Sequence, residues 1–272
     1  LPPAIATLGS LRKSWRVSGL TSSTYPGVVT NADLRFAAGY FPTTSYYDFF
    51  DLERVEVDPV GNKVVTDSGK RLAYDFLIVA TGLELNYGAI EGMDTALIGQ
   101  NGLGSIYAGP AAAAATWQAL SRFADTGGVG LFGRPAGEMK CAGAPLKMTF
   151  LTDDKARREG RRKGLDIVYN AHNNTVFSVV PVNDKVKTLF AERDVKVNYG
   201  HALSAIDPDR KTARFKTLQG DVWQDYDFIH VIPPMRAPDA VRNSPLPWQD
   251  GAFAADGWVQ ADKATLRHPR YA

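Results

Sequence analysis

The chain contains very little cysteine, because Cys141 is the only one among its 272 residues. An internal disulfide is therefore excluded, and cysteine usage does not indicate a redox compartment. A strong net charge is also missing, since 31 basic residues stand against 29 acidic ones. The chain has no basic run, so its composition gives no case for binding nucleic acid.

Long apolar runs are absent too, and no stretch of the sequence is long enough to span a bilayer. No signal peptide is visible, but the chain begins at Leu1 rather than Met, which leaves a processed or truncated N-terminus open. The four histidines are too scattered for a metal site, so we predict no metal and a structural role for each. His230 is expected to be a core histidine, with a proton relay as the alternative.

The sequence does contain one order of strands and turns twice, about 150 residues apart. Each copy begins with a strand that leads into an Asp-Pro turn, and it closes on an apolar run that ends in Gly or Pro-Pro. The first copy has predicted strands at 52–57, 63–66, 71–74 and 76–82, and the second at 203–206, 212–217, 222–224 and 228–232. We predict that 76–82 is buried on both faces. The repeat indicates two domains of one type.

Helices and strands alternate between the two copies. Helices are predicted at 111–123, 145–162 and 182–192, and strands at 129–132, 165–169 and 195–199. This alternation predicts an α/β fold with two Rossmann-like domains, each a doubly wound parallel sheet with a β-meander. We expect the basic cluster at 157–163 and the pair Asp153-Asp154 to be solvated.

The chemistry gathers in the stretch from Lys140 to Lys147. The predicted strand at 129–132 precedes it, and a predicted helix opens at Pro145, where a missing N–H costs nothing. Cys141 therefore lies on a strand-to-helix loop, ahead of a helix N-terminus and between two lysines. The helix dipole and the lysines favour a thiolate, so we predict a reactive thiol. The alternative is a small buried thiol that only packs.

The glycines of 128–133 match the pattern G-x-G-x-x-G letter for letter. A dinucleotide-binding fingerprint needs its glycines after the strand, in the turn that opens the helix. Here the first two glycines bracket the start of the predicted strand, so we predict a false match. Cys141 then lies where a pyrophosphate would bind. No fingerprint is found before residue 50.

Four segments resemble the sulfide:quinone oxidoreductases and the related flavocytochrome c sulfide dehydrogenase flavoproteins, which have two dinucleotide domains of the glutathione-reductase type. They are residues 74–82, 140–147, 230–235 and 257–271. Many flavoproteins share the Ala-Thr-Gly strand. The Lys-Cys-Ala-Gly-Ala-Pro loop is more specific and favours the quinone-reducing branch. The resemblance covers roughly residues 50–271.

The resemblance implies an enzyme that uses FAD to oxidise sulfide to sulfane sulfur or polysulfide and passes electrons to quinone. Cys141 would be one of two redox cysteines near the flavin, and Lys140 and Lys147 would help hold sulfur anions. The residues implied to approach FAD, or to lie at its isoalloxazine or quinone end, are Ala80, Thr81, Gly82, Pro233 and Pro234. The implied partners are sulfide, a sulfur acceptor and quinone. A peripheral membrane contact and a homo-oligomer are compatible with it, and a bacterial membrane-associated or periplasmic location is expected.

The resemblance also divides the chain. Residues 1–100 correspond to the first part of an FAD-binding domain, 101–236 to a second nucleotide-binding-like domain with the redox cysteine, and 237–272 to a return to the first domain. The family's glycine fingerprint should precede residue 50, and its Gly-Asp segment and second redox cysteine should follow Tyr271. We therefore predict the middle of a longer flavoprotein.

Three alternatives remain. The electrons pass to a partner cytochrome c, or the chain is a non-catalytic remnant or scaffold module of this fold. A nicotinamide-dependent disulfide reductase ranks lowest, because its adjacent cysteine pair is absent and Cys141 occupies the second nucleotide loop.

Overall fold

The structure is a computed structural model, and it describes residues 5–9, 55–66 and 69–271. The described chain divides into two compact units. One comprises the described parts of Leu1–Glu84 together with Arg236–Ala272, and the other is Leu85–Met235. The chain crosses between them twice, and the crossings pair as β6 (Glu84–Leu85) and β15 (Met235–Arg236).

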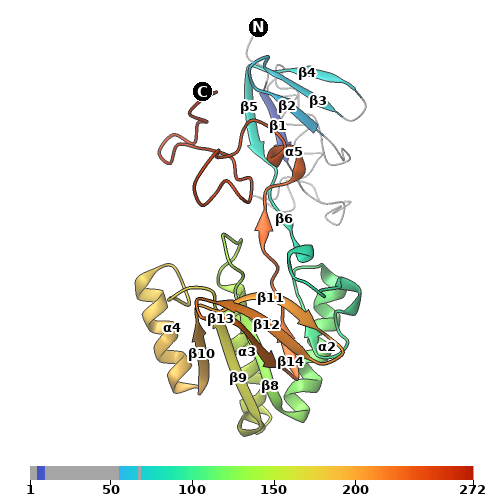
Figure 1. The fold of residues 1–272 in the computed structure, drawn as a ribbon, viewed down its shortest axis with the longest axis vertical. Coiled ribbons are helices and arrows are strands. Elements are labelled where there is room, and N and C mark those ends of the chain that lie inside the picture. The colour runs from blue at the N-terminus through green and yellow to red at the C-terminus, as the bar shows by residue number, and fades with distance from the viewer. Residues whose placement is uncertain (1–4, 10–54, 67–68, 272) are drawn as a thin grey trace, which may run out of the picture. The chain divides into compact units, whose positions relative to one another are not determined.

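The unit Leu85–Met235 is built on a parallel sheet of five strands in the order β10-β9-β8-β14-β7 (Figure 1). Its strands are β7 (Leu103–Gly104), β8 (Gly128–Gly133), β9 (Leu165–Ala171), β10 (Val195–Tyr199) and β14 (Phe228–His230). Its helices are α2 (Pro110–Thr126), α3 (Ala144–Arg158) and α4 (Val180–Glu192), with short 3-10 turns at Tyr87–Ala89, Thr95–Leu97 and Arg162–Gly164. An antiparallel meander completes the unit with β11 (Ala202–Asp207), β12 (Thr212–Thr217) and β13 (Gly220–Asp225).

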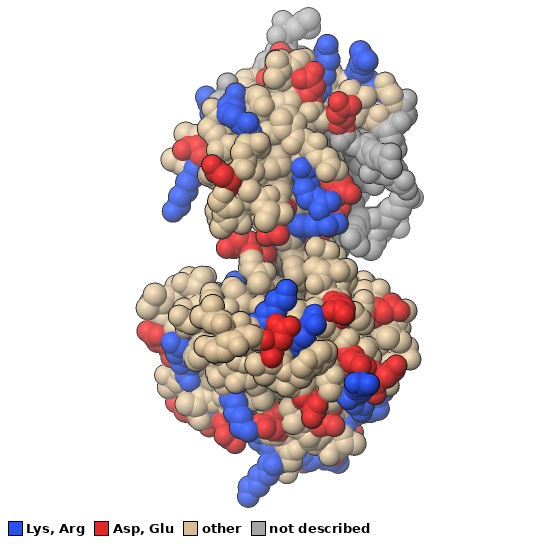
Figure 2. Space-filling model, in the orientation of Figure 1, with Lys and Arg blue, Asp and Glu red and all other residues tan. Residues whose placement is uncertain are grey.

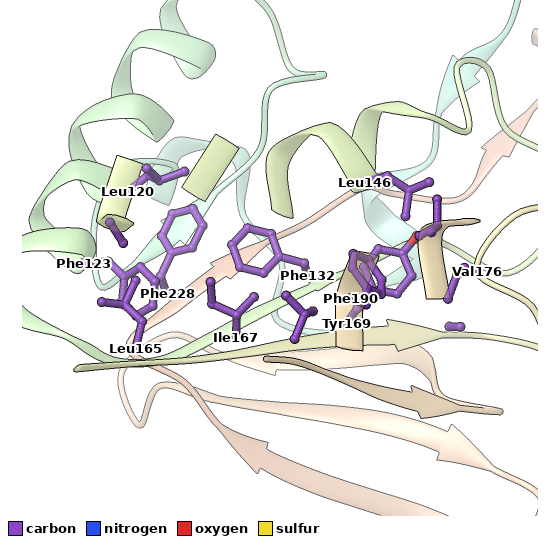
Figure 3. Packing of buried hydrophobic residues seen from close by; sticks show 14 of the residues in the cluster. Leu120, Phe123, Phe132, Leu146, Leu165, Ile167, Tyr169, Val176, Phe190 and Phe228 are labelled. Carbon is purple, nitrogen blue, oxygen red and sulfur yellow. The ribbon is translucent and has the colours of Figure 1, made fainter. Parts of the chain in front are cut away.

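The main core of this unit lies between the sheet and the helices (Figure 3). The ring of Phe228 in β14 lies 5.6 Å from Phe123 of α2 and 5.8 Å from Phe132 of β8. Tyr169 of β9 lies 5.3 Å from Phe190 of α4. A second apolar cluster joins the opposite side of the sheet to the meander, with Ile229, Leu131 and Phe215 among its members. The sheet is therefore covered on both faces.

The other unit pairs β1 (Ile5–Gly9) with β5 (Phe76–Ala80) in parallel, and carries the meander β2 (Val55–Asp58), β3 (Lys63–Thr66) and β4 (Arg71–Ala73). A short helix, α5 (Asp239–Arg242), follows the return of the chain. The repeated Asp-Pro turn has one physical cause in both units. The Asp58 carboxylate accepts a hydrogen bond from Gly61 N at 2.8 Å, and that of Asp207 accepts one from Arg210 N at 3.0 Å.

The predicted Rossmann-like fold class with meanders is confirmed, but β5 is not buried on both faces as predicted. Phe76 and Ile78 are 59% and 52% exposed. Leu77 and Val79 point the other way and pack against an apolar cluster around Val64. One face of β5 therefore packs, and the other remains accessible.

The end of α3 also corrects the sequence analysis. The helix ends at Arg158 rather than residue 162, and Gly160 follows with a positive φ of 71°. Asp153 is fully buried rather than solvated, and it accepts hydrogen bonds from three arginines: Arg157 at 2.8 Å, Arg162 at 2.6 Å and Arg193 at 2.6 Å. Arg157 and Arg162 of the basic cluster thus bind one buried carboxylate, together with Arg193 from outside the cluster. Asp154 is about half exposed, as predicted.

Charges of both signs intermingle on the face of the unit Leu85–Met235 seen in Figure 2. Within the described residues, no helix has the length and apolar character that crossing a membrane requires. Among those residues, no group of three or more His, Cys, Asp or Glu side chains could hold a metal ion.

Candidate functional site

Cys141 lies on the loop between β8 and α3, at the carboxyl end of the parallel sheet. The loop closes onto the helix through Ala144 N, which donates to the Cys141 carbonyl at 2.8 Å. Pro145 stands in the first turn of α3, where its missing N–H is harmless. Ligands of doubly wound sheets bind at this edge, so the loop has the position of a binding site.

The thiol of Cys141 is exposed, which contradicts the alternative of a buried packing residue. The backbone of Cys141 has a φ of +56°, in the left-handed region that residues other than glycine rarely adopt. This conformation costs roughly 1–2 kcal/mol in an L-residue. Neighbouring contacts must therefore hold the turn.

Lys140 supplies those contacts through its backbone. Its N–H donates to the sulfur of Met235 at 3.2 Å, and its carbonyl accepts a hydrogen bond from the Tyr107 hydroxyl at 3.1 Å. Its ammonium lies 5.9 Å from the centre of the Tyr107 ring. Met235 directly follows Pro233 and Pro234, so the structure brings the cysteine loop and the Pro-Pro loop together.

Tyr107 is a residue that the sequence analysis missed. It lies on the loop between β7 and α2, and its side chain is partly buried. Burial raises the pKa of Tyr107 to about 12, with further contributions from Cys141 and Tyr87. The Tyr107 hydroxyl therefore keeps its proton at neutral pH. The available signal was topological: both loops leave parallel strands at their carboxyl ends.

A short polar chain supports the Tyr107 loop. The Tyr87 and Ser105 hydroxyls are 2.6 Å apart, and the Ser105 N–H donates to the Thr116 hydroxyl of α2 at 2.8 Å. Ser105 and Thr116 are fully buried. The loop that carries Tyr107 is thus tied to the first turns of α2.

The other predicted site residues have the following positions. Lys147 is exposed in the first turns of α3, and its N–H donates to Gly143 O at 2.9 Å. Pro233 is buried, and the carbonyl of Pro234 accepts from Asn86 N at 2.8 Å. The segment Ala80-Thr81-Gly82 belongs to the other unit.

That segment continues from the carboxyl end of β5. Ala80 pairs with Gly9 of β1, and Gly82 has a positive φ of 71°. Ala80 and Gly82 are exposed, and Thr81 is partly so. Small accessible residues at this edge allow a flat ligand to approach the backbone closely.

His230 is a core histidine, as predicted, with 3% of its surface exposed. Burial lowers its pKa to about 4, so the ring is neutral at pH 7. Neither ring nitrogen has a hydrogen-bond partner within the described chain. His230 lines a cavity of about 20 Å³ near the ends of β8 and β14, which has room for about one water molecule.

The literal G-x-G-x-x-G match is false, because all six residues lie inside β8. Its glycines allow close packing instead. A Cβ on Gly130 would lie 2.7 Å from the Phe123 ring, and one on Gly128 would collide with the Asp227 carboxylate. That carboxylate accepts a hydrogen bond from Val129 N at 2.8 Å. Before residue 50, where the sequence contains no such fingerprint, the structure describes only residues 5–9.

Parallel sheets joined to meanders, in two units of one chain, define a pair of Rossmann-like domains of the two-dinucleotide-domain class. The resemblance to the sulfide:quinone oxidoreductases within that class is confirmed. The chain is 38% identical over 219 residues to the mitochondrial sulfide:quinone oxidoreductase of Mus musculus, which is 79% of this chain and 46% of that protein. It is 37% identical over 213 residues to that of Dictyostelium discoideum, with 78% and 45% covered.

Among solved structures, the sulfide:quinone oxidoreductase of Aquifex aeolicus matches with a TM-score of 0.62 at 21% identity, over 84% of this chain and 51% of that one. No family model matches the chain. The chain spans about half the length of the curated relatives it matches.

Proposed function

We propose that the chain carries the sulfide-oxidising, quinone-reducing chemistry named in its relatives, with FAD as cofactor and Cys141 as the reacting thiol. The observation that supports this most is the exposed Cys141 on a constrained turn at the carboxyl edge of the sheet. The relatives named sulfide:quinone oxidoreductase support sulfide as reductant and quinone as acceptor. The proposal includes the division of the chain into residues 1–100 and 237–272 of an FAD-binding domain and residues 101–236 of a second nucleotide-binding-like domain.

The proposed chemistry takes two electrons from each sulfide. Cys141 would hold the oxidised sulfur as a persulfide. An acceptor thiolate would then attack the outer sulfur, break the S–S bond and release the Cys141 thiolate. FAD, when bound, would supply the two-electron oxidant for this step, with quinone as the final acceptor. Lys140 and Lys147, both exposed, attract hydrosulfide and polysulfide anions to the loop. Cys141 is the only cysteine of this chain, so the acceptor supplies the second thiol of the exchange.

The residues after β5 fit a flavin in one respect. Ala80 and Gly82 present no bulky side chain at the sheet edge and are accessible. In the proposal they approach the cofactor together with Thr81. The proposal also assigns Pro233 and Pro234 to the isoalloxazine or quinone end. They precede Met235, whose sulfur accepts a hydrogen bond from Lys140 N.

The first test is an absorbance spectrum of the purified protein, followed by anaerobic sulfide addition. We expect flavin bands that bleach with sulfide in the wild type and fail to bleach in Cys141→Ser. Flavin that ignores sulfide contradicts sulfide as the reductant. Absence of flavin at the intact mass of the chain makes the non-catalytic module the leading reading.

A matched pair of lysine variants tests the anion role. Lys147→Ala is expected to slow sulfide bleaching about tenfold, because it removes one exposed cation from the first turns of the helix that follows Cys141. Lys185→Ala removes an exposed lysine from α4 and is expected to leave the rate unchanged. Equal rates in the two variants contradict the role of Lys147.

The electron acceptor is tested separately, by adding a soluble quinone or cytochrome c to the sulfide-reduced protein. Reoxidation by quinone alone is expected. Reoxidation by cytochrome c alone supports the flavocytochrome alternative.

The bacterial membrane-associated or periplasmic location remains a prediction. The relatives from Mus musculus and Dictyostelium discoideum carry the word mitochondrial in their names.

A further inference from the structure

Tyr107 and Cys141 lie on different strand-to-helix loops of one sheet. β7 ends at Gly104 and α2 begins at Pro110, so the Tyr107 loop leaves the sheet at its carboxyl edge. The Cys141 loop leaves β8 at the same edge, with β14 between the two strands. The parallel topology therefore brings the two loops together.

The contact between the loops falls on the residue just before the strained turn. The Tyr107 hydroxyl donates to the Lys140 carbonyl at 3.1 Å, and the ammonium of Lys140 lies 5.9 Å from the centre of the same ring. On the other side of the turn, Ala144 N donates to the Cys141 carbonyl at 2.8 Å. The backbone of Cys141 is thus held on both sides.

A positive φ in a residue with a side chain persists only where the surroundings hold it. The Ala144 hydrogen bond is local and belongs to the start of α3. The Tyr107 hydrogen bond spans 33 positions in the sequence. It therefore fixes the turn relative to the rest of the sheet edge.

We infer that Tyr107 is a positioning residue, whose hydroxyl holds Cys141 in the left-handed turn that presents its thiol to solvent. The inference rests on the proposed function in one respect, namely that Cys141 is the reacting thiol. No contact of Tyr107 with sulfide or with the flavin is part of it. The supporting chain from Tyr87 through Ser105 to Thr116 keeps the Tyr107 loop itself in place.

The test compares Tyr107→Phe with wild type in the full chain. Phenylalanine keeps the ring beneath the Lys140 ammonium and removes only the hydrogen bond to the carbonyl. The readout is the rate of Cys141 alkylation by iodoacetamide from about pH 6 to about pH 10, which reports both the accessibility of the thiol and its thiolate fraction. We expect an alkylation rate changed at least threefold near neutral pH, together with an altered pH profile.

Tyr199→Phe is the matched control. Tyr199 is an exposed tyrosine of the same unit, 40% accessible, with the Lys187 ammonium 5.7 Å from its ring centre. Its alkylation profile should equal that of the wild type. If Tyr107→Phe also equals the wild type, the hydroxyl has no positioning role and the inference is wrong.

Amide hydrogen exchange separates positioning from general stability. Tyr107→Phe should speed exchange in residues 140–144 and leave β9 and α4 unchanged. Faster exchange throughout Leu85–Met235 would show a merely structural role and overturn the inference. Neither measurement needs sulfide or flavin, so failure of the proposed function would appear in the bleaching experiment and not here.

Discussion

At the scale of single residues, the Asp153 carboxylate gathers three arginines around one buried charge. Its fully buried carboxylate joins Arg157 of α3, Arg162 of the following turn and Arg193 after α4. Burial by itself would raise the pKa of Asp153, but the hydrogen bonds from these arginines outweigh it and hold the pKa below its ordinary value. The carboxylate is therefore ionised in the folded chain.

Asp153→Asn should lower the free energy of unfolding by about 3 kcal/mol, because it leaves desolvated guanidinium groups without their counter-charge. Asp154→Asn is the control, since Asp154 and its partner Arg158 have side chains 52% and 71% exposed. That change should fall within about 0.5 kcal/mol of wild type. Urea unfolding at pH 7 measures both. Equal losses would show that burial of the carboxylate does not matter.

The lowered pKa of Asp153 also determines how the stability of the fold depends on pH. The contribution of Asp153 is present above the unfolded-state pKa of about 3.9 and is lost as pH falls through the folded-state value. The stability difference between wild type and Asp153→Asn should therefore shrink below about pH 4. Unfolding at several acidic pH values checks this. A constant difference down to the lowest pH would contradict it.

His230 is a base rather than an acid, but its contribution to the stability of the fold also falls as the pH is lowered. Its folded-state pKa of about 4 lies below the ordinary value of 6.5, so the unfolded chain binds the extra proton first. Stability is lost as pH falls from about 7 to about 5, by about 2 kcal/mol for this group. His230→Leu should remove that part of the acid sensitivity, while His201→Gln, at a partly exposed histidine, should retain it. Parallel pH curves for wild type and His230→Leu would contradict the prediction.

At the scale of secondary-structure elements, Gly130 of β8 sets how closely α2 approaches the sheet. Gly130→Ala should cost about 2 kcal/mol of stability, because the new methyl group meets the buried Phe123 ring and overpacks the core. Gly143→Ala should be nearly neutral, since a Cβ there meets nothing within 4 Å and its φ is −78°. Thermal unfolding of the two variants compares them. A similar melting temperature for both would mean that α2 can shift away.

Periodicity predicted the elements wherever local pattern and tertiary packing agree. The helices near 111–123 and 182–192, and the strands of both meanders, follow directly from the sequence. The partners of Asp153 could not be predicted, because Arg193 lies 40 positions away and its approach depends on how α4 packs. The role of Tyr107 could not be predicted for the same reason. Its hydrogen bond joins two loops that are neighbours only because of the strand order in the sheet.

At the scale of the whole molecule, each apolar cluster found among the described residues belongs to one unit. Both clusters of the larger sheet lie entirely within Leu85–Met235, and the cluster around Val64 lies entirely in the other unit. Each described unit thus has its own core, which is the property expected of a domain that folds by itself.

A fragment of residues 85–235 should therefore unfold cooperatively and give dispersed amide signals. Phe228→Ala in that fragment should lose about 4 kcal/mol of stability, because Phe228 is fully buried between two phenylalanine rings. Urea unfolding and an NMR spectrum check both statements. Collapsed amide dispersion in the unmutated fragment would show that the unit depends on the rest of the chain.

The pairing of β6 with β15 has a consequence for the history of the gene. Because the chain enters and leaves Leu85–Met235 through two strands that pair with each other, that unit has the form of an insertion into its neighbour. Both units also carry a three-stranded antiparallel meander whose first turn is held by an Asp carboxylate. Duplication of an ancestral domain, with one copy placed inside the other, would produce this arrangement. The reverse event would restore an uninterrupted ancestor by joining the codons on either side of the inserted copy.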